Sequence, residues 1–306
     1  MWPNSSQKKI FLRAFFAGFF AFHNKSEKCL TAVPPTKSDE SDQSDKSAVQ
    51  MTVTDQMGRR VAMPFPPRRI VSLVPSQTEL LYDLGLGEQV VGVTKFCIHP
   101  AEARKSAAII GGTKNFDLEK IAALTPDLII GNKEENYRDG IAQLAARHPV
   151  WLSNINSLPE ALDMIRRVGF IAGAKDRAEA LAAEIGASFA ALAASEPVVS
   201  AAYFIWRKPY MVAATSTFID DMLRRAGFAN VFAGLSRYPE ITAEALAAAA
   251  PQRILLSSEP YPFGPKQVFE FQAICPSATV EIVDGELFSW YGSRLRRSAA
   301  YFSQLR

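Results

Sequence analysis

The stretch DRAEALAAEIGASFAALAA, residues 176–194, predicts one long helix in the middle of the chain. Asp176 is a suitable N-cap, and Glu179 three positions on completes a capping-box-like pair. At ~1.5 Å per residue the helix is roughly 28 Å long, about the width of a small domain. Pro197 ends it. Apolar side chains recur every three or four residues and line one stripe: Leu181, Ile185, Phe189 and Leu192.

Strand and helix patterns alternate on both sides of this helix. Such alternation is typical of parallel sheets with helices on their faces. The arrangement predicts an α/β protein of two lobes joined by a rigid rod. The alternative is a single α/β domain with an ordinary surface helix here. The two-lobe interpretation divides the chain into a signal-like segment and disordered tether at 1–50, an N-terminal lobe at 51–156, connecting helices at 157–196 and a C-terminal lobe at 197–306.

Residues 1–50 differ in character from the rest. A basic start precedes the short apolar run AFFAGFFAF, residues 14–22, and this order resembles a secretory signal or a short anchor. The alternative is a wrongly assigned start or a disordered tail. The residues before Cys29 match a lipoprotein acceptor sequence poorly, so lipid attachment there stays open. Residues 34–48 are polar, acidic and low in complexity, which predicts a flexible tether.

Composition excludes several classes of function. The chain has 306 residues, 48% of them hydrophobic, and a formal net charge of +3, which leaves no basic footprint for nucleic acid. The cysteines, Cys29, Cys97 and Cys275, make no disulfide framework and no CxxC pair. Three scattered histidines cannot build a zinc site by themselves.

The folded part is predicted to begin near Met51 with a hairpin that has Gly58 in its turn. The buried strand RRIVSLV follows, and Ser76 and Glu79 have the spacing of a capping box for the next helix. Ser157 is expected to cap the helix that leads into the rod. Further strands are predicted at VVGVT, AAIIGG, DLIIGN and PVWLS, and after the rod at VVSAAYFIW, MVAAT, RILLSS and TVEIV.

The two halves of the chain repeat one another. In the first half Asp117 stands two residues before Glu119, and a proline and the strand DLII follow. In the second half Thr242 stands two before Glu244, and a proline and RILL follow. A carboxylate in the first turn of a helix usually gains only about 0.3–1 kcal/mol from the helix dipole. Equivalent acids on two lobes also suit a two-point dock for a basic partner.

A ligand site is expected where the two lobes meet. In open parallel sheets ligands bind beyond the carboxyl ends of the strands, and in two such lobes these ends can face one another. Large aromatic rings gather in the loops of the second half, which suits a bulky, partly apolar ligand. The alternative is that several of these rings only pad the surface. The candidates are Pro75, Ser76, Phe96, Thr113, Lys114, Asn132, Trp206, Tyr210, Thr215, Tyr238, Tyr261, Trp290, Tyr291 and Arg294.

Catalysis has little support in the sequence. No GxSxG, P-loop, HExxH or GxGxxG motif occurs. Cys97 and His99 lie two residues apart in a loop, where a buried thiol is a better interpretation than a catalytic pair. Asp220 and Asp221 are expected on a solvated helix face. Without a cluster of histidines or carboxylates, a free metal ion is not expected as the ligand.

Two motifs together resemble the class III substrate-binding proteins of ABC transporters: PSQTELLYDLGL, residues 75–86, and LEKIAALTPDLII, residues 118–130. The resemblance covers about residues 51–306. It implies two Rossmann-like lobes, a long backbone helix and a ligand in the interlobe cleft. It also implies that Glu119 and Glu244 form salt bridges with arginines of a permease dimer, which works with ATPase subunits. A monomer in the periplasm or cell envelope, without cofactor or catalysis, is expected.

Within this family the chain looks most similar to the cobalamin-binding branch. In that branch, aromatic residues touch the corrin at the positions that match Phe96, Trp206 and Tyr238 here. The segment 284–294 matches the region that holds an acidic residue and an arginine in that branch. Thr113 and Asn132 stand where that branch has tryptophan, which leaves room for another corrinoid or metal chelate. A ferric siderophore or haem receptor, or an enzyme or intracellular sensor on the same scaffold, remains open. The predicted ligand-binding set is Phe96, Thr113, Asn132, Trp206, Tyr210, Tyr238, Trp290, Tyr291 and Arg294.

Overall fold

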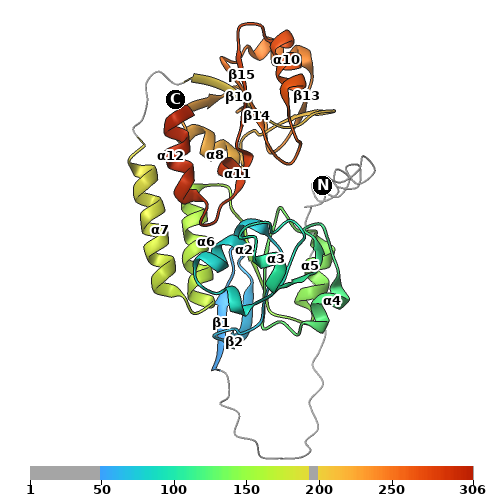
Figure 1. The fold of residues 1–306 in the computed structure, drawn as a ribbon, viewed down its shortest axis with the longest axis vertical. Coiled ribbons are helices and arrows are strands. Elements are labelled where there is room, and N and C mark those ends of the chain that lie inside the picture. The colour runs from blue at the N-terminus through green and yellow to red at the C-terminus, as the bar shows by residue number, and fades with distance from the viewer. Residues whose placement is uncertain (1–48, 193–198, 306) are drawn as a thin grey trace, which may run out of the picture.

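The computed structural model describes residues 49–192 and 199–305. Figure 1 shows two lobes one above the other, with helices along one side of them. These helices are α6 (Leu158–Ile171), α7 (Lys175–Ala190) and α12 (Leu295–Leu305). The predicted export segment and Cys29 lie outside the described residues.

The N-terminal lobe begins with an antiparallel hairpin, β1 (Val49–Thr54) and β2 (Arg60–Phe65). Gly58 lies in its turn with φ +77°, a conformation that favours glycine. Asp55 fixes the turn, because its Oδ1 atom accepts the backbone N–H groups of Met57 and Arg59 at 2.9 and 2.8 Å. The predicted hairpin is confirmed.

A parallel sheet in the order β5-β4-β3-β8-β9 forms the centre of the N-terminal lobe. Every residue of β3 and β8 is buried, as expected for a parallel sheet covered by helices on both faces. The strands are β3 (Ile70–Ser72), β4 (Val90–Val93), β5 (Ala108–Ile109), β8 (Leu128–Asn132) and β9 (Val150–Ser153). Between and around them lie α2 (Pro75–Asp83), the 3-10 turn η1 (Gly87–Gln89), α3 (Ala103–Ser106), the short pair β6 (Gly111–Gly112) and β7 (Asn115–Phe116), α4 (Leu118–Ala123) and α5 (Arg138–Ala145).

The C-terminal lobe contains a mixed sheet in the order β13-β11-β10-β14-β15, with β12 also beside β10. Strands β10, β12, β14 and β15 are parallel, whereas β11 pairs antiparallel with β10 and β13 pairs antiparallel with β11. The strands are β10 (Val199–Trp206), β11 (Tyr210–Val212), β12 (Phe228–Asn230), β13 (Glu240–Ile241), β14 (Arg253–Ser257) and β15 (Thr279–Val283). The helices are α8 (Phe218–Arg225), α9 (Ala243–Ala249), α10 (Pro265–Ile274) and α11 (Gly285–Ser289).

Helix α7 confirms the predicted central helix and most of its apolar stripe, although the helix ends at Ala190 and Leu192 lies beyond it. Leu181, Ile185 and Phe189 are buried, and the helix packs against α6 and α12. The predicted N-cap was wrong by two residues, because Ala174 and not Asp176 precedes the helix, and Ala174 offers no side-chain cap. Glu179 does not close a capping box, since its Oε2 atom accepts Arg166 Nε of α6 at 2.9 Å. Residues 193 and 194 lie outside the described part of the chain.

The internal repeat has a structural counterpart in α4 and α9. Asp117 accepts the N–H of Lys120 and Thr242 accepts the N–H of Ala245, so both helices have the predicted N-caps. Glu119 and Glu244 lie exposed in the first turns of these helices. The predicted Ser76–Glu79 capping box was wrong. Helix α2 begins at Pro75 after Val74, and no side chain caps it.

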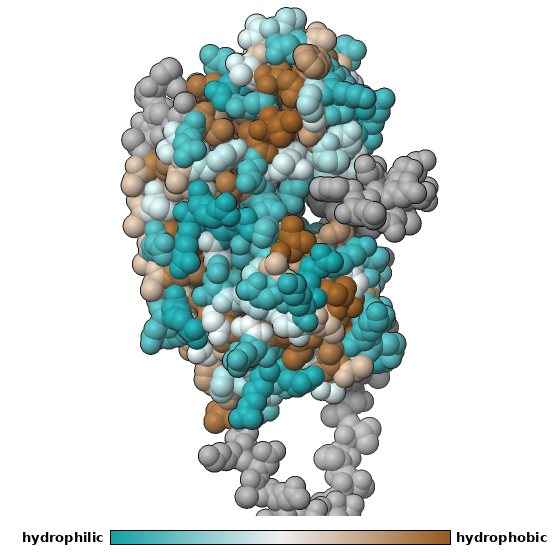
Figure 2. All heavy atoms as spheres, in the orientation of Figure 1, coloured by the Kyte–Doolittle hydropathy of each residue, from teal (hydrophilic) through white to brown (hydrophobic). Residues whose placement is uncertain are grey.

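One hydrophobic core joins the lobes. It runs from the N-terminal sheet through α6 and α7 into α8, α12 and the near side of the C-terminal sheet. A second, smaller core lies in the C-terminal lobe between the sheet, α9 and α10. On the outside, Figure 2 shows hydrophobic residues gathered over the part of this lobe where Figure 1 draws β14 and β15. Ile282, on the border strand β15, is 42% exposed.

Candidate functional site

A cavity of about 220 Å³ lies between the two lobes. Its N-terminal wall comes from segments that follow strands: the start of α2 after β3, the loop after β4, the turn between β6 and β7, and the loop after β8. Its C-terminal wall comes from the end of β10, α8, the loops after β12 and β14, and the segment after α11. The lining residues are Pro75, Ser76, Phe96, Thr113, Lys114, Glu134, Glu135, Ile205, Phe218, Ile219, Tyr238, Ser257, Glu259, Pro260, Ser289, Trp290 and Tyr291.

Polar contacts hold the lobes together beside this cavity. Tyr291 of the C-terminal lobe donates its hydroxyl hydrogen to Glu135 Oε1 of the N-terminal lobe. Arg237 forms an ion pair with Glu134 and also donates to Asn156 Oδ1 at 3.1 Å. The cavity is therefore closed by groups that would have to separate for a large ligand to enter.

The lobes also touch through their backbones where Gly292 meets the start of α2. A Cβ atom at Gly292 would lie 2.4 Å from the carbonyl oxygen of Ser76. Real Cβ atoms do not approach backbone oxygens so closely, so only glycine fits here without a shift of the chain. This contact sets how far Trp290 and Tyr291, which precede it, extend over the cavity.

Burial changes the acid–base behaviour of the cavity wall. Burial, and next the charge of Glu286, raise the pKa of Glu259 to about 7. Its Oε1 atom accepts hydrogen bonds from Ser289 Oγ and Trp290 Nε1, both at 3.0 Å. Burial also raises the pKa of Glu135 and lowers the pKa of Lys114 to about 8. The charges of this wall therefore respond to pH near neutrality.

Arg294 lies behind the wall and ties both lobes to Trp290. Its Nε and Nη2 atoms donate to the two oxygens of Glu79 on α2, at 2.9 and 2.7 Å. Its Nη1 atom lies 2.7 Å from Glu286 Oε2, and its guanidinium carbon lies 4.7 Å from the centre of the Trp290 ring. His99 packs edge-on against the same ring. Arg294 and His99 together hold the Trp290 ring in place.

The predicted ligand-binding residues divide into two groups. Five of them line the cavity: Phe96, Thr113, Tyr238, Trp290 and Tyr291. Four do not: Asn132, Trp206, Tyr210 and Arg294.

The residues of the second group have other contacts. The Oδ1 atom of Asn132 accepts the N–H groups of Glu134 and Glu135 at 2.7 and 3.1 Å, so Asn132 shapes the loop that carries both acids. Trp206 packs edge-on against Tyr261. Tyr210 donates to Glu270 Oε1.

Sequence reasoning missed the acidic members of the wall. Glu134 and Glu135 come two and three residues after the strand DLIIGN, and Glu259 comes two residues after β14. The strand-end rule that gave the other candidates also applies to these positions. Attention to aromatic residues alone left them out.

The structure also tests the predictions for the acidic pair Asp220 and Asp221 and for the thiol of Cys97. Asp220 and Asp221 were expected on a solvated face, which is wrong, because both are buried. Asp221 Oδ2 accepts the N–H of Leu158 at the start of α6 and the Nε–H of Arg225 at 2.7 and 2.8 Å. Cys97 is the expected buried thiol. Its sulfur lies 3.1 Å from Thr78 Oγ1, and burial raises its pKa.

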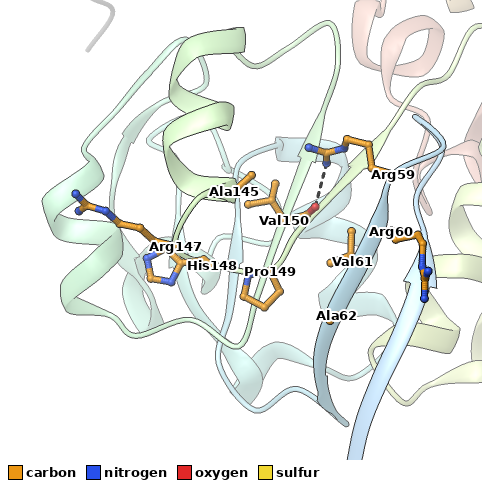
Figure 3. A pocket seen from close by; sticks show the side chains of 9 residues that line it. All are labelled: Arg59, Arg60, Val61, Ala62, Ala145, Arg147, His148, Pro149 and Val150. Atoms are coloured by element: carbon orange, nitrogen blue, oxygen red, sulfur yellow. Dashed lines mark hydrogen bonds between the residues drawn. The ribbon is translucent and has the colours of Figure 1, made fainter. Parts of the chain in front are cut away.

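A larger hollow of about 390 Å³ lies on the N-terminal lobe alone, between β2 and the segment from α5 to β9. Figure 3 shows the guanidinium groups of Arg60 and Arg147 pointing away from one another. Arg59 donates to the carbonyl oxygen of Val150 at 3.0 Å. The cationic groups do not converge, so the smaller interlobe cavity is the better candidate site. Within residues 49–192 and 199–305, no group of three or more His, Cys, Asp or Glu side chains is placed to hold a metal ion.

Comparison with known proteins identifies the family of this chain. The family described as "Periplasmic binding protein" matches residues 70–272. The chain belongs to this family. An uncharacterised ABC transporter substrate-binding lipoprotein of Bacillus subtilis, YvrC, is 29% identical over 231 residues, 70% of this chain and 73% of that protein. A vitamin B12-binding protein of Pectobacterium carotovorum is 27% identical over 241 residues, 76% and 86% of the two chains.

Solved structures of the family share the fold. The periplasmic haem-binding protein RhuT from Roseiflexus superimposes with a TM-score of 0.70 and 27% identity, over 78% of this chain and 97% of that one. The vitamin B12-binding protein BtuF of Vibrio cholerae gives a TM-score of 0.70 and 24% identity, over 79% and 97%. The resemblance to class III substrate-binding proteins is thus confirmed.

Membership of the family fixes the broad class of function. The chain is a substrate-binding protein of the ABC-transporter type, and its family and fold are those of binding proteins rather than enzymes. In the part of the chain that the structure describes, no helix is both long enough and apolar enough to cross a membrane.

Proposed function

We propose that this chain binds cobalamin or a related corrinoid in the interlobe cavity and delivers it to the permease of an ABC importer. The observation that carries the proposal is an aromatic wall drawn from both lobes, with Phe96 on one side and Tyr238, Trp290 and Tyr291 on the other. Flat rings on opposite walls suit a large, partly apolar macrocycle. Relatives named as vitamin B12-binding proteins support the choice of ligand.

A corrinoid requires the lobes to separate. Pockets that enclose even drug-sized ligands measure about 300–1,000 Å³, whereas this cavity measures about 220 Å³. The contacts that must break are the Arg237–Glu134 ion pair and the hydrogen bond from Tyr291 to Glu135. Helix α7 packs against α6 and α12 in the core that joins the lobes, so we expect a small opening rather than a wide one.

The partners follow from the same proposal. The chain acts in the cell envelope as a monomer, and its exposed Glu119 and Glu244 pair with basic residues of the permease dimer, which works with ATPase subunits. The equivalent positions of the two acids, each at the start of a capped helix in its own lobe, support a two-point dock. Names of relatives as a lipoprotein and as periplasmic proteins support the location.

Haem is the second candidate, because Tyr291 lines the cavity and a tyrosine can ligate ferric iron. Burial, and next the charge of Glu135, raise the pKa of Tyr291 well above its ordinary value. The phenol therefore holds its proton strongly while it contacts Glu135, and iron ligation by Tyr291 requires this contact to break.

A fluorescence titration tests the proposal. The purified chain is titrated in parallel with cyanocobalamin, haem and a ferric trihydroxamate, and Trp290 in the cavity wall reports binding. Saturable one-to-one quenching by cyanocobalamin, lost in Trp290→Phe, is the expected result. Trp151, fully buried in the N-terminal lobe, supplies a constant background. Saturable binding of haem with a charge-transfer band, and no response to cyanocobalamin, contradicts the proposal in favour of haem.

A further inference from the structure

Two carboxyl groups face the cavity from opposite lobes. Glu135 follows β8 in the N-terminal lobe, and Glu259 follows β14 in the C-terminal lobe. Each uses its Oε1 atom for contacts within the protein, Glu135 with Tyr291 and Glu259 with Ser289 and Trp290. Their Oε2 atoms accept no hydrogen bond from the described residues, and both side chains are only partly buried. Each acid therefore keeps an acceptor for a ligand.

When Glu135 and Glu259 are ionised, the cavity wall has an excess of negative charge. Its ionisable carboxyl and amino groups are those of Lys114, Glu134, Glu135 and Glu259. The charge of Glu134 is balanced by Arg237. The single positive charge of Lys114 then faces the two negative charges of Glu135 and Glu259. The ammonium group of Lys114 already donates to the backbone carbonyl oxygen of Glu134.

This arrangement of charges repels an anionic ligand. Aromatic and apolar neighbours such as Phe218, Trp290 and Tyr291 lower the local dielectric, so repulsion between like charges is stronger than in water. A ligand with N–H donors or a positive charge instead satisfies the open carboxylate oxygens.

We infer that Glu135 and Glu259 select the charge of the ligand, admitting neutral or cationic chelates that present N–H donors and rejecting anionic ones. This inference rests on the proposed function and narrows it. A corrinoid carries primary amides around its ring, with N–H groups for both acids. Haem carries two carboxylates, and ferric catecholates are more negative still.

The test uses ligands matched in shape. Cyanocobalamin is compared with its monocarboxylic acid, in which one side-chain amide is hydrolysed, by fluorescence titration of the full chain at pH 8. We expect the native chain to bind the neutral form about tenfold more tightly. The substitutions Glu135→Gln and Glu259→Gln keep the size and a hydrogen-bond acceptor, and each should reduce this preference to about threefold or less. A second pair, a cationic ferric trihydroxamate and an anionic ferric tris-catecholate, gives a comparison independent of the corrin.

Matched controls separate charge selection from general effects. Glu102→Gln in the N-terminal lobe and Glu240→Gln in the C-terminal lobe remove exposed carboxyl groups outside the cavity, and both should keep the full preference. Equal binding of the neutral and acid forms by the native chain overturns the inference, as does an unchanged preference in both cavity variants. If no corrin binds but the cationic hydroxamate is preferred over the catecholate, the corrinoid proposal fails and charge selection stands. If the chain binds none of the four probes, both the corrinoid proposal and the inference of charge selection are refuted.

Discussion

Glu259 is a residue whose charge depends on its neighbours. Its ordinary pKa of 4.5 rises to about 7 in the folded chain, through burial, the charge of Glu286 and, more weakly, the charge of Glu135, while Ser289 and Trp290 oppose the rise. Between these two pH values the folded chain keeps a proton that the unfolded chain has lost. The folded state binds more protons, so this group makes the free energy of unfolding decrease as pH rises through the window.

The substitution Glu259→Gln should remove this dependence. We expect the native chain to lose stability relative to the variant between about pH 4.5 and 7, with a constant difference at lower pH. Urea unfolding of both proteins at pH 4, 5, 6, 7 and 8 measures the effect. Parallel stability curves across this range would show that the pKa of Glu259 is not raised.

Arg294 gives a second prediction at this scale. Its side chain is 4% exposed, and it neutralises Glu79 and Glu286 together. Arg294→Ala should lower the free energy of unfolding by about 3–5 kcal/mol, because both acids lose the guanidinium group that neutralises them. Arg296→Ala is the control, since Arg296 pairs with Glu184 at the surface and should matter by about 0–1 kcal/mol. Equal effects of the two variants in urea unfolding would contradict the assignment.

Single residues also show the limit of sequence reasoning about the site. The strand-end rule located the cavity, and Phe96, Thr113, Tyr238, Trp290 and Tyr291 line it. The rule fixes where a residue lies along the chain, but it does not fix the direction of its side chain. Packing within the lobe decides that direction, and it turns Trp206 and Tyr210 toward Tyr261 and Glu270 instead.

At the scale of elements, prediction succeeded where periodicity was strong. The hairpin, the parallel N-terminal sheet, α7 and the repeated helices α4 and α9 all follow from spacing and capping. The antiparallel pairing of β11 with β10 and β13 was not foreseen, because strand direction depends on the pairing partner and not on local pattern. Capping predictions at Ser76 and Asp176 failed where the helix began before the proposed cap.

The contact between Gly292 and the start of α2 can be tested by substitution. Gly292→Ala would press a Cβ atom onto the backbone of Ser76, so the segment after α11 must shift away from α2. We expect a loss of about 1–3 kcal/mol in the free energy of unfolding, together with weaker ligand binding because Trp290 and Tyr291 move with it. Urea unfolding and the fluorescence titration measure the two effects.

Gly234→Ala is the matched control for this variant. No heavy atom lies within 4 Å of the position of its Cβ atom, so the change should leave both measurements within experimental error of the native chain. A Gly292→Ala protein that behaves like this control would mean that the lobes do not meet at Ser76.

At the scale of the whole molecule, docking and ligand binding should be separable. Glu119 and Glu244 are exposed, and neither lines the cavity. The double charge reversal Glu119→Lys/Glu244→Lys should abolish uptake through the permease and leave ligand affinity unchanged. Transport in reconstituted vesicles and the fluorescence titration measure the two properties. Glu88→Lys/Glu102→Lys is the control with the same change in net charge, and it should transport normally. Loss of affinity in the first variant would refute the docking role.

The hydrophobic core that crosses between the lobes has a consequence for protein engineering. A designer who wished to change the ligand of this receptor would be tempted to graft the C-terminal lobe of a relative onto the N-terminal lobe. Such a chimera would cut through the core between α7 and α12, where Phe189 and Phe302 have ring centres 6.1 Å apart. Successful grafts will need both of these helices from the same parent, or only the cavity loops exchanged on an intact scaffold.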